Sequence, residues 1–487
     1  MSEEPERTEQ SDLLATRRAK LERLRADGID PFPHSFAGVV AIDGVHAAHP
    51  DLPDGEETDV AYRIAGRLAA RRGQGKMAFL DLVDRSGRMQ LQARVDVLGE
   101  ERMERLLALD LGDLVGVDGT AFRSRRGELS LRVDDFTVLA KSLRPPPDKH
   151  HGLQDVETRL RRRELDLLAN EDSRDVFIKR AKIIAAVRRH LDGQGFLEVE
   201  TPVLQPLYGG ALATPFVTHF NALDQRMYLR IATELYLKRC IVGGLERVYE
   251  LGKDFRNEGL SPKHNPEFTM IEWYAAYADY EDEMRRLEGV VGAAAAAIDY
   301  DGELDFSSPW KRITLRDAIL EDCGVDILAH RERDALAAAI GDRLETEDRT
   351  WPQLVDDLLS KFVEPKITNP TFVTDYPVEL SPFAKDHRTE PGLTERFEAF
   401  CNGMEIANAF TELNDPDEQR ARFEAQVRFS EAGDAEAQPY DEVFVEALEQ
   451  GMPPTGGLGL GIDRLTMVLT GRKTIRDVVL FPALRET

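Results

Sequence analysis

The sequence predicts an α+β protein with two folded parts: a small β-barrel near the amino terminus and a larger domain built on an antiparallel β-sheet flanked by helices. Three observations lead to this prediction. Short alternating strand patterns fill residues 63–139, a proline run follows at Pro145–Pro147, and longer helical and strand patterns then continue to the end. The length of 487 residues, 42% of them hydrophobic, is enough for more than one core.

The amino-terminal segment predicts a helix that packs against its neighbours. Leucines recur among charged residues between Asp12 and Ala26, and the pattern stops at Gly28 and Pro31. We take residues 1–60 as an N-terminal helical extension.

Targeting and membrane signals are missing from the sequence pattern. The chain starts with acidic residues, and no uncharged apolar run is long enough to span a bilayer. Cys240, Cys323 and Cys401 lie far apart without a CxxC pattern, which favours a reducing compartment and argues against structural zinc. We therefore expect a cytoplasmic protein with no membrane segment.

Residues 61–144 predict a small closed barrel of the OB type. About five short strand patterns are separated by glycine-containing turns, and barrels of this kind bind oligonucleotides on one face. The whole chain has a formal charge of −26, but seven basic residues stand against two acids between Ala61 and Gln90, which leaves a local charge of +5. That segment is suited to contact phosphates.

A stiff linker is predicted over residues 145–156, because prolines fix the backbone and cannot join a sheet. The larger domain then covers residues 157–487. It includes a helical insertion at about 285–370, in which no residue pattern points to chemistry.

Two predicted strands carry carboxylates among aromatic side chains. Period-two alternation places Glu272 on the same face as Phe268, Met270 and Tyr274, and it places Glu412 on the same face as Asn408 and Phe410. A carboxylate in such surroundings is costly unless a cation meets it. Two interpretations stay open: a structural ion pair with an internal Arg or Lys, which the local pattern slightly favours, or a pocket for a small cation.

Glu398 and Glu405 flank the dipeptide Asn402-Gly403, which suits two facing strand ends that share a hard divalent ion. Such oxygen ligands favour magnesium or manganese alongside substrate phosphates. Glu405 is out of phase with Asn408, so this interpretation requires a bulge or break near Ala407. Solvated surface glutamates are the commoner alternative.

The glycine-rich segment Gly457–Gly461 is a weak match to a dinucleotide-binding loop, because the chain ends too soon for the βαβ unit that such a loop requires. It predicts instead a backbone that leaves room beneath a ligand, with Arg464 in the first turn of the following helix.

With these motifs in view, the chain resembles the class II aminoacyl-tRNA synthetases, and among them the lysyl-tRNA synthetase family, over nearly its whole length. The three family motifs are matched, in order, by Gly195–Pro202, Phe255–Phe268 and Gly459–Arg464, and the class I peptides HIGH and KMSKS are absent. Further matches indicate lysine specificity: Gly209–Ala211, Thr233–Tyr236, Arg256–Gly259, His264–Met270 and Asn408–Asp415.

The resemblance implies a function and its partners. The chain is expected to activate L-lysine with ATP to lysyl-adenylate and to transfer the lysyl group to the 3′ end of tRNA(Lys), with Mg²⁺ as cofactor and as a homodimer. It implies an anticodon-binding role for the barrel and a class II catalytic role for residues 157–487.

The resemblance also implies roles for particular residues. Arg256 and Arg464 are the implied catalytic residues, and Glu398 and Glu405 the implied metal ligands. The implied lysine-binding residues are Gly210, Glu234, Arg256, Glu272, Tyr274, Asn408, Phe410 and Glu412. The implied ATP-binding residues are Arg256, Glu258, His264, Asn265, Phe268 and Arg464. The implied anticodon-binding residues are Arg72, Phe79, Gln90 and Glu128.

Some features depart from the family pattern or leave alternatives open. Thr214 stands where the family usually has Arg or Lys, and Glu164 where it usually has Tyr. A position in the barrel core is the alternative for Phe79. The alternative functions are a related protein that modifies proteins, a catalytically impaired nucleic-acid-binding or regulatory protein, and an aspartyl or asparaginyl specificity. Glu272 and Glu412 oppose that specificity because they would repel an anionic side chain.

Overall fold

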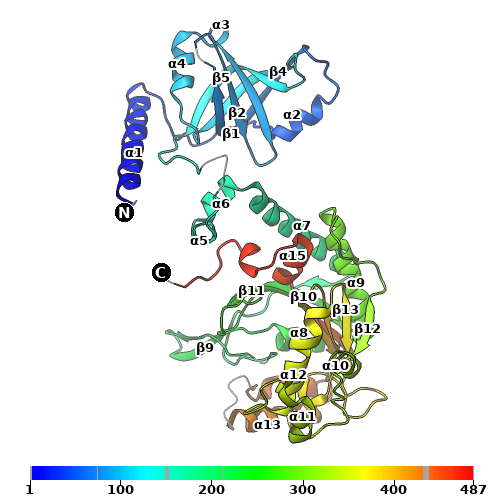
Figure 1. The fold of residues 1–487 in the computed structure, drawn as a ribbon. Coiled ribbons are helices and arrows are strands. Elements are labelled where there is room, and N and C mark those ends of the chain that lie inside the picture. Colours follow the sequence, from blue (N-terminus) through cyan, green and yellow to red (C-terminus); the bar gives the residue numbers. More distant parts are fainter. Residues whose placement is uncertain (1–2, 74, 148–152, 212, 432–437, 486–487) are drawn as a thin grey trace. The chain divides into compact units, whose positions relative to one another are not determined.

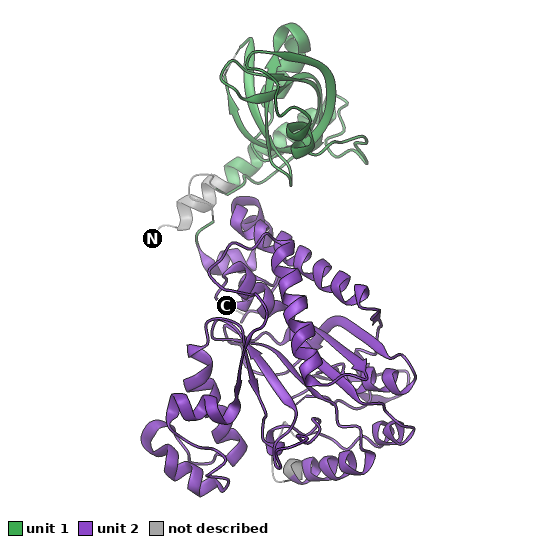
Figure 2. Cartoon of the chain, turned by 90° about the vertical axis from the view of Figure 1, so that its right-hand side faces the viewer, with its two compact units in different colours: residues 1–154 green, residues 155–487 purple. Residues whose placement is uncertain are grey.

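The computed structural model describes residues 3–73, 75–147, 153–211, 213–431 and 438–485. The chain forms two compact units, Met1–Gln154 and Asp155–Thr487 (Figure 2). Among the described residues, no helix is long and apolar enough to pass through a bilayer.

Unit 1 is a five-stranded closed barrel with strand order β1-β2-β3-β5-β4, as the sequence predicts (Figure 1). The barrel strands are β1 (Glu57–Arg72), β2 (Met77–Val83), β3 (Arg88–Arg94), β4 (Leu114–Arg123) and β5 (Leu129–Ala140). The short helices α3 (Val95–Leu98) and α4 (Glu100–Ala108) lie between β3 and β4 in the chain. Inward-facing apolar residues of all five strands fill one core, which explains the alternating pattern of the sequence.

The predicted amino-terminal helix is present as α1 (Glu3–Ala26). It is fixed to the rest of unit 1 by Arg17, whose guanidinium donates to the carbonyl oxygens of Leu111 and Ser142, both at 3.1 Å. A second helix, α2 (Ile42–Ala48), was not predicted, since only Ile42 and Val45 of its seven residues are buried.

Unit 2 is built on an eight-stranded sheet of order β12-β13-β14-β15-β16-β11-β10-β6. Its neighbouring strands are antiparallel except for the pairs β12–β13 and β6–β10. The strands are β6 (Leu197–Glu198), β10 (Arg247–Phe255), β11 (Glu267–Ala276), β12 (Lys311–Thr314), β13 (Thr371–Thr374), β14 (Arg396–Phe400), β15 (Glu405–Thr411) and β16 (Thr455–Gly461).

Three helices cover one face of this sheet: α7 (Glu171–Gly193), α9 (Tyr280–Ala297) and α15 (Ile462–Thr470). Alternate residues of the central strands, such as Ile271, Trp273 and Leu458, pack against them in the main core. The intervening residues of the same strands face the opposite side. That side carries the site described below.

The predicted helical insertion contains α10 (Leu315–Cys323), α11 (Arg333–Ile340), α12 (Trp351–Leu358) and the π-helix η2 (Leu359–Val363). These elements have a core of their own around Leu354 and Leu358. The short 3-10 helix η1 (Gly341–Arg343) lies between α11 and α12, η3 (Glu364–Lys366) follows η2, and η4 (Val378–Leu380) follows β13.

Further elements surround the open face of the sheet. They are the small sheet β7 (Leu204–Gln205), β8 (Val217–Phe220) and β9 (Gln225–Leu229), and the helices α8 (Glu234–Val242), α13 (Pro416–Glu431) and α14 (Glu442–Glu449). The helices α5 (Val156–Arg161) and α6 (Arg163–Ala169) begin unit 2, and η5 (Ile475–Asp477) lies near its end.

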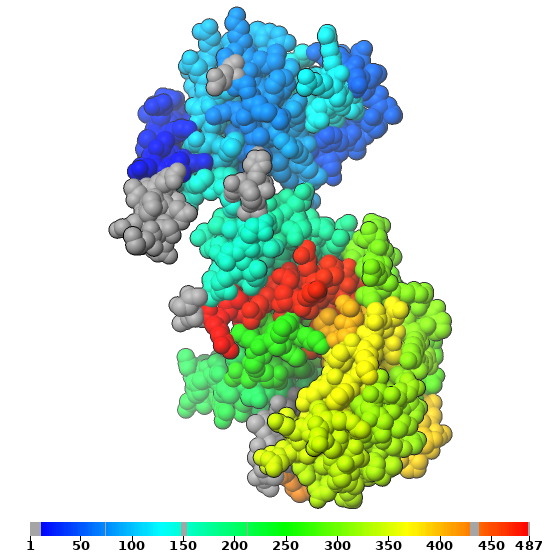
Figure 3. Space-filling model, in the orientation of Figure 1, coloured from blue at the N-terminus to red at the C-terminus, as the bar shows by residue number. Residues whose placement is uncertain are grey.

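The start and the end of unit 2 lie side by side, as the cyan-green and red segments of Figure 3 show. Buried Arg163 donates to the carbonyl oxygens of Leu480 at 2.9 Å and Arg476 at 2.8 Å. The C-terminal segment is therefore part of the packed unit.

Candidate active site

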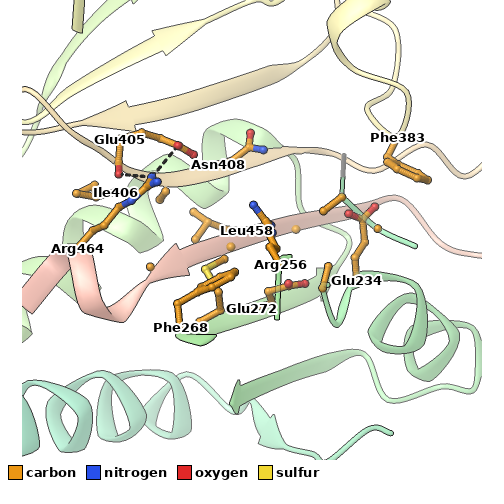
Figure 4. Close-up of a pocket in the computed structure, with 18 of the residues that line it drawn as sticks. Glu234, Arg256, Phe268, Glu272, Phe383, Glu405, Ile406, Asn408, Leu458 and Arg464 are labelled. Carbon is orange, nitrogen blue, oxygen red and sulfur yellow. Dashed lines mark hydrogen bonds and ion pairs between the residues drawn. The ribbon is translucent and has the colours of Figure 1, made fainter. Parts of the chain in front are cut away.

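A cavity of about 370 Å³ lies on the open face of the sheet in unit 2 (Figure 4). Its floor comes from β11, β15 and β16, and its walls come from the start of α8, the loop before β11 and the segment after η4. Phe268, Met270, Glu272 and Tyr274 of β11 all line it, as predicted from period-two alternation. Every residue implied for lysine or ATP binding lines the same cavity.

The glycines of β16 make room for the cavity. A Cβ atom added at Gly457 would overlap the Glu412 carboxylate and the Tyr274 ring, and one at Gly459 would lie 3.0 Å from the Met270 methyl group. The segment therefore provides a flat backbone floor, as the sequence predicted, and is not a dinucleotide-binding loop.

One end of the cavity is strongly acidic. Glu234, Glu272 and Glu412 are all buried and come from α8, β11 and the residue after β15. Burial raises the pKa of each of these carboxylic acids, because a low-dielectric environment disfavours the ionised form.

Glu412 has an internal cation. The Lys238 ammonium, on a side chain with no solvent exposure, forms ion pairs with Glu412 Oε2 and with Glu234 Oε1, the latter at 2.5 Å. The ion-pair interpretation is thus correct for Glu412, with Lys238 as the internal cation. Glu412 Oε1 is buried and has no hydrogen-bond partner among the described residues.

Glu272 has no such partner: within the described ranges no Lys or Arg forms an ion pair with it. Its carboxylate accepts hydrogen bonds at 3.2 Å from the Thr233 backbone N–H and the Tyr274 hydroxyl. Burial, together with the negative charges of Asp254 and Glu234, raises the pKa of Glu272 to about 8. Glu272 is therefore the carboxylate that is least compensated in the ligand-free protein.

Arg256 projects into the middle of the cavity (Figure 4). Its guanidinium lies over the Phe268 ring, with Cζ 5.1 Å from the ring centroid, and its Nε has no hydrogen-bond partner within the described chain. Behind it, buried Asp254 pairs with Arg230 at 3.1 Å, and burial raises the pKa of Asp254 to about 6. Asp254 thus contributes negative charge near Arg256.

Arg464 lies at the other end of the cavity, at the start of α15. Its Nη1 donates to Glu405 Oε2 at 2.8 Å, and its Nη2 lies 3.1 Å from His264 Nε2. Burial and the positive charge of Arg464 lower the pKa of His264, which favours a neutral imidazole. Cationic and polar groups therefore gather at the end opposite the three acids.

Glu398 and Glu405 lie on neighbouring strands, and the predicted bulge is present. The register of β14 against β15 shifts where Ala399 faces Ala407 but Phe400 faces Glu405. Arg396 donates to Glu398 at 2.6 Å and the Tyr376 hydroxyl does so at 2.9 Å, yet burial and the negative charge of Glu405 raise the pKa of Glu398 to about 7.

This charge environment fits a divalent cation, which would relieve the repulsion between Glu398 and Glu405. Within the described ranges, no group of three or more His, Cys, Asp or Glu side chains is arranged to hold a metal ion. A metal at this pair would therefore need further oxygen ligands, such as those of a bound triphosphate.

The remaining residues implied for substrate binding differ in how many hydrogen bonds already hold their side chains within the protein. Asn265 is held by the backbone: its Nδ2 donates to the Glu267 carbonyl at 2.5 Å, and its Oδ1 accepts from the Ala483 N–H at 3.3 Å. The Asn408 amide accepts from Arg396 at 3.0 Å. Glu258 is exposed at the cavity edge.

The residues implied for anticodon binding gather on the outer surface of the barrel in unit 1. Phe79 is half-buried between the fully inward Ala78 and Leu80, so it is not a core residue, and its register partners are Arg72 and Gln92. The side-chain oxygen of Gln90 accepts a hydrogen bond at 3.2 Å from the hydroxyl of Ser130, which follows Glu128 by two positions in the chain. The structure thus brings Arg72, Phe79 and Gln90 to the neighbouring strands β1, β2 and β3, with Glu128 directly before β5.

Neither departure from the family pattern disrupts the fold. Thr214 accepts a hydrogen bond at its carbonyl from the Asn257 N–H at 2.8 Å. Glu164 is exposed and pairs with Arg162 at 2.6 Å.

Three residues of the site were not predicted from the sequence. Lys238 follows Glu234 by four positions, which is equally typical of an exposed helix. Asp463 accepts from the Thr269 N–H at 2.8 Å. Gln438 contacts the loop of Gly210, whose N–H donates to its Oε1 at 3.2 Å.

Comparisons with known proteins agree with this geometry. Residues 155–485 match the family described as tRNA synthetases class II (D, K and N), and residues 62–139 match the OB-fold nucleic acid binding domain family. The chain is 49% identical to the lysine--tRNA ligase of Lactiplantibacillus plantarum over 98% of this chain and 97% of that protein. It is 50% identical to the lysine--tRNA ligase of Moorella thermoacetica over 98% of both chains.

Proposed function

The chain belongs to the class II tRNA synthetases, within them to the lysine--tRNA ligases, and we propose that the cavity of unit 2 holds lysine and ATP end to end. The enzyme activates L-lysine with ATP and transfers the lysyl group to tRNA. The interpretation as a catalytically impaired binding protein is not favoured, since the charged groups needed for the first step lie in one cavity.

The charge of the acidic end carries the proposal for the lysine site. Three buried carboxylates and one buried ammonium leave two negative charges when all four groups are ionised. Free lysine brings two ammonium groups, the α-ammonium on Cα and the ε-ammonium at the far end of the side chain. The pocket and the substrate are therefore complementary in charge. Glu272 and Glu412, with Tyr274, are the groups that would receive the ε-ammonium, and Glu272 is the least compensated of them.

This arrangement also accounts for specificity. An uncharged analogue would leave the buried carboxylates without a cation, which costs roughly 1–3 kcal/mol for each unsatisfied group. An aspartate side chain would be repelled by the same acids. Glu234, at the start of α8, is placed to receive the α-ammonium together with backbone carbonyl groups near Gly210.

Activation needs no general base, because the lysine carboxylate is already ionised at neutral pH. One of its oxygens attacks the α-phosphorus of ATP, the bond to the bridging oxygen breaks, and pyrophosphate leaves. Arg256 stands between the two substrates and stabilises the negative charge at the α-phosphate, while Arg464 binds the terminal phosphates. A ribose hydroxyl of the tRNA then attacks the acyl carbon and releases AMP.

Magnesium is the proposed cofactor. Glu398 and Glu405 would hold it, and it would neutralise phosphate charge during the transfer. Phe268 offers a ring face for the adenine, on which the Arg256 guanidinium lies in the ligand-free protein.

Unit 1 is the proposed anticodon-binding part. Its half-buried Phe79 offers a stacking surface for an unpaired base, and Arg72, Gln90 and Glu128 would read the base edges. tRNA(Lys) is the expected partner.

We propose a homodimer that works in the cytoplasm. Large apolar side chains are exposed on the motif 1 segment and the small sheet: Leu197, Val203, Leu204, Val217, Phe220 and Leu223. An exposed apolar patch of this kind is typical of a subunit interface. The Leu197→Asp variant should shift the protein to monomers in sedimentation velocity, and an unchanged sedimentation coefficient would contradict this interface.

The three free cysteines fit a reducing compartment.

Pyrophosphate exchange into ATP, measured with single amino acids, tests the substrate assignment. We expect exchange with lysine and background rates with aspartate, asparagine and norleucine. Exchange with aspartate in place of lysine would overturn the assignment, and no exchange with any amino acid would support the binding-protein interpretation.

A further inference from the structure

Lys238 lies behind the acidic end of the cavity and does not line it. Its side chain leaves α8, has no solvent exposure, and places its ammonium 5.5 Å from the Phe383 ring centroid and 5.4 Å from that of Phe410. A buried ammonium in such surroundings is retained only if anions compensate it. Here two carboxylates do so, and both belong to the proposed lysine site.

The ion pairs are arranged so that each carboxylate gives one oxygen to Lys238 and keeps the other. Lys238 contacts Glu234 through Oε1 and Glu412 through Oε2. Glu412 Oε1 occupies the space above Gly457, where any added Cβ would overlap it. That oxygen has no hydrogen-bond partner in the described part of the chain. The free oxygen therefore lies against the glycine strand that forms the cavity floor.

We propose that Lys238 is a positioning residue for the substrate: by holding one oxygen each of Glu234 and Glu412, it fixes the spacing of the two oxygens offered to the ammonium groups of lysine. This inference rests on the proposed lysine site. Lys238, although outside the cavity, would thereby help the site to select a substrate side chain of the right length.

Charge supports this role as well. Among the described residues, Glu272, Tyr274 and Arg396 also interact electrostatically with one or both of these carboxylates, and Arg396 is the cation of these three. Lys238 is thus the ion-pair partner whose positive charge opposes the rise that burial causes in the pKa of Glu234 and of Glu412. Without it, both carboxylates would be more readily protonated and free to turn.

The test is the Lys238→Met variant, which keeps the volume of the side chain and removes its charge. In pyrophosphate exchange, we expect the KM for lysine to rise at least about tenfold, while the KM for ATP changes less than about twofold. The preference for lysine over ornithine, which is one methylene shorter, should fall about tenfold, because the spacing of the two carboxylates is no longer fixed. Lys238→Arg, which keeps a cation, should restore most of the preference.

Controls separate this role from a structural one. Lys182→Met, at an exposed lysine on α7, should match the wild type in every parameter. If Lys238→Met does not fold, as judged by circular dichroism, Lys238→Gln is measured in its place. Equal increases in the KM for lysine and ATP, or an unchanged preference over ornithine in a folded variant, would overturn the inference. A wild-type enzyme without lysine-dependent exchange would instead overturn the proposed function.

Discussion

Arg464 and Glu405 form an ion pair across the nucleotide half of the cavity, with Nη1 2.8 Å from Oε2. These are the groups that we assign to the terminal phosphates and to the metal. In the ligand-free protein they neutralise each other. ATP with its metal ion would replace each partner with one of the same sign of charge: phosphate for Glu405, and the metal for Arg464.

Replacing Arg464 should mainly affect the nucleotide. We expect Arg464→Ala to lower kcat/KM for ATP in pyrophosphate exchange by about 10²–10³, because a charge-stabilising donor is lost, while the KM for lysine changes little. Arg312→Ala, at an exposed arginine on β12, is the matched control. An equal loss for lysine would place Arg464 elsewhere in the reaction.

Magnesium dependence should report on Glu405. Chelation should abolish exchange, and Glu405→Gln should raise the Mg²⁺ concentration for half-maximal rate by about tenfold or more. Because the pKa of Glu398 is raised to about 7, protonation competes with the metal below that value, and less Mg²⁺ should suffice as the pH rises through 7. Identical Mg²⁺ titrations for Glu405→Gln and the exposed control Glu390→Gln would remove Glu405 from the metal site.

Lysine binding should release a proton from Glu272. The pKa of this group is raised to about 8 in the ligand-free protein, so it is largely protonated at pH 7 and must ionise to receive an ammonium. kcat/KM for lysine should therefore rise with pH up to about 8. Glu272→Gln should lose this dependence and raise the KM for lysine roughly 10- to 100-fold, which corresponds to about 1.5–3 kcal/mol.

The control for that experiment is Glu267→Gln, at an exposed residue of the same strand. It should keep both the pH profile and the KM of the wild type. A pH profile that is identical in Glu272→Gln and wild type would show that another group titrates.

Phe79 should matter for tRNA and not for activation. Phe79→Ala removes a stacking surface worth about 1–3 kcal/mol per base, so the KM for tRNA(Lys) in the charging reaction should rise roughly 5- to 100-fold. Pyrophosphate exchange should be unaffected. The control is Phe32→Ala, at an exposed phenylalanine in the segment after α1. Normal charging by Phe79→Ala would argue against base stacking at this position.

The fold was largely predictable because burial leaves a periodic trace in the sequence. Alternating apolar residues mark the barrel strands apart from their bulges, and the same rule placed Glu272 of β11 and Glu412, the residue after β15, on the cavity side. A bulge near Ala407, which the phase of Glu405 required if that residue faces the site, is also present. Helix α2 was not predicted, because it is short and most of its residues are exposed.

The partners of the site residues were less predictable, because tertiary contacts leave no local signal. Glu234 and Lys238 have the spacing of an ordinary surface pair, and only the fold shows that both are buried. The contact of Gln438 with Gly210 joins residues 228 positions apart. Asp81 likewise pairs with both Arg72 and Arg88 on the barrel, a contact that the local sequence does not reveal.

The glycine strand beneath the acidic end limits how the enzyme can change its amino acid preference. Gly457 has no side chain to trim, so no substitution there can deepen the cavity, whereas any larger residue would collide with Glu412 and Tyr274. Accepting a bulkier lysine derivative would have to come from shortening the surrounding walls, for example at Phe410. Redesign for unnatural amino acids should therefore leave this strand intact and begin with the side chains that stand around it.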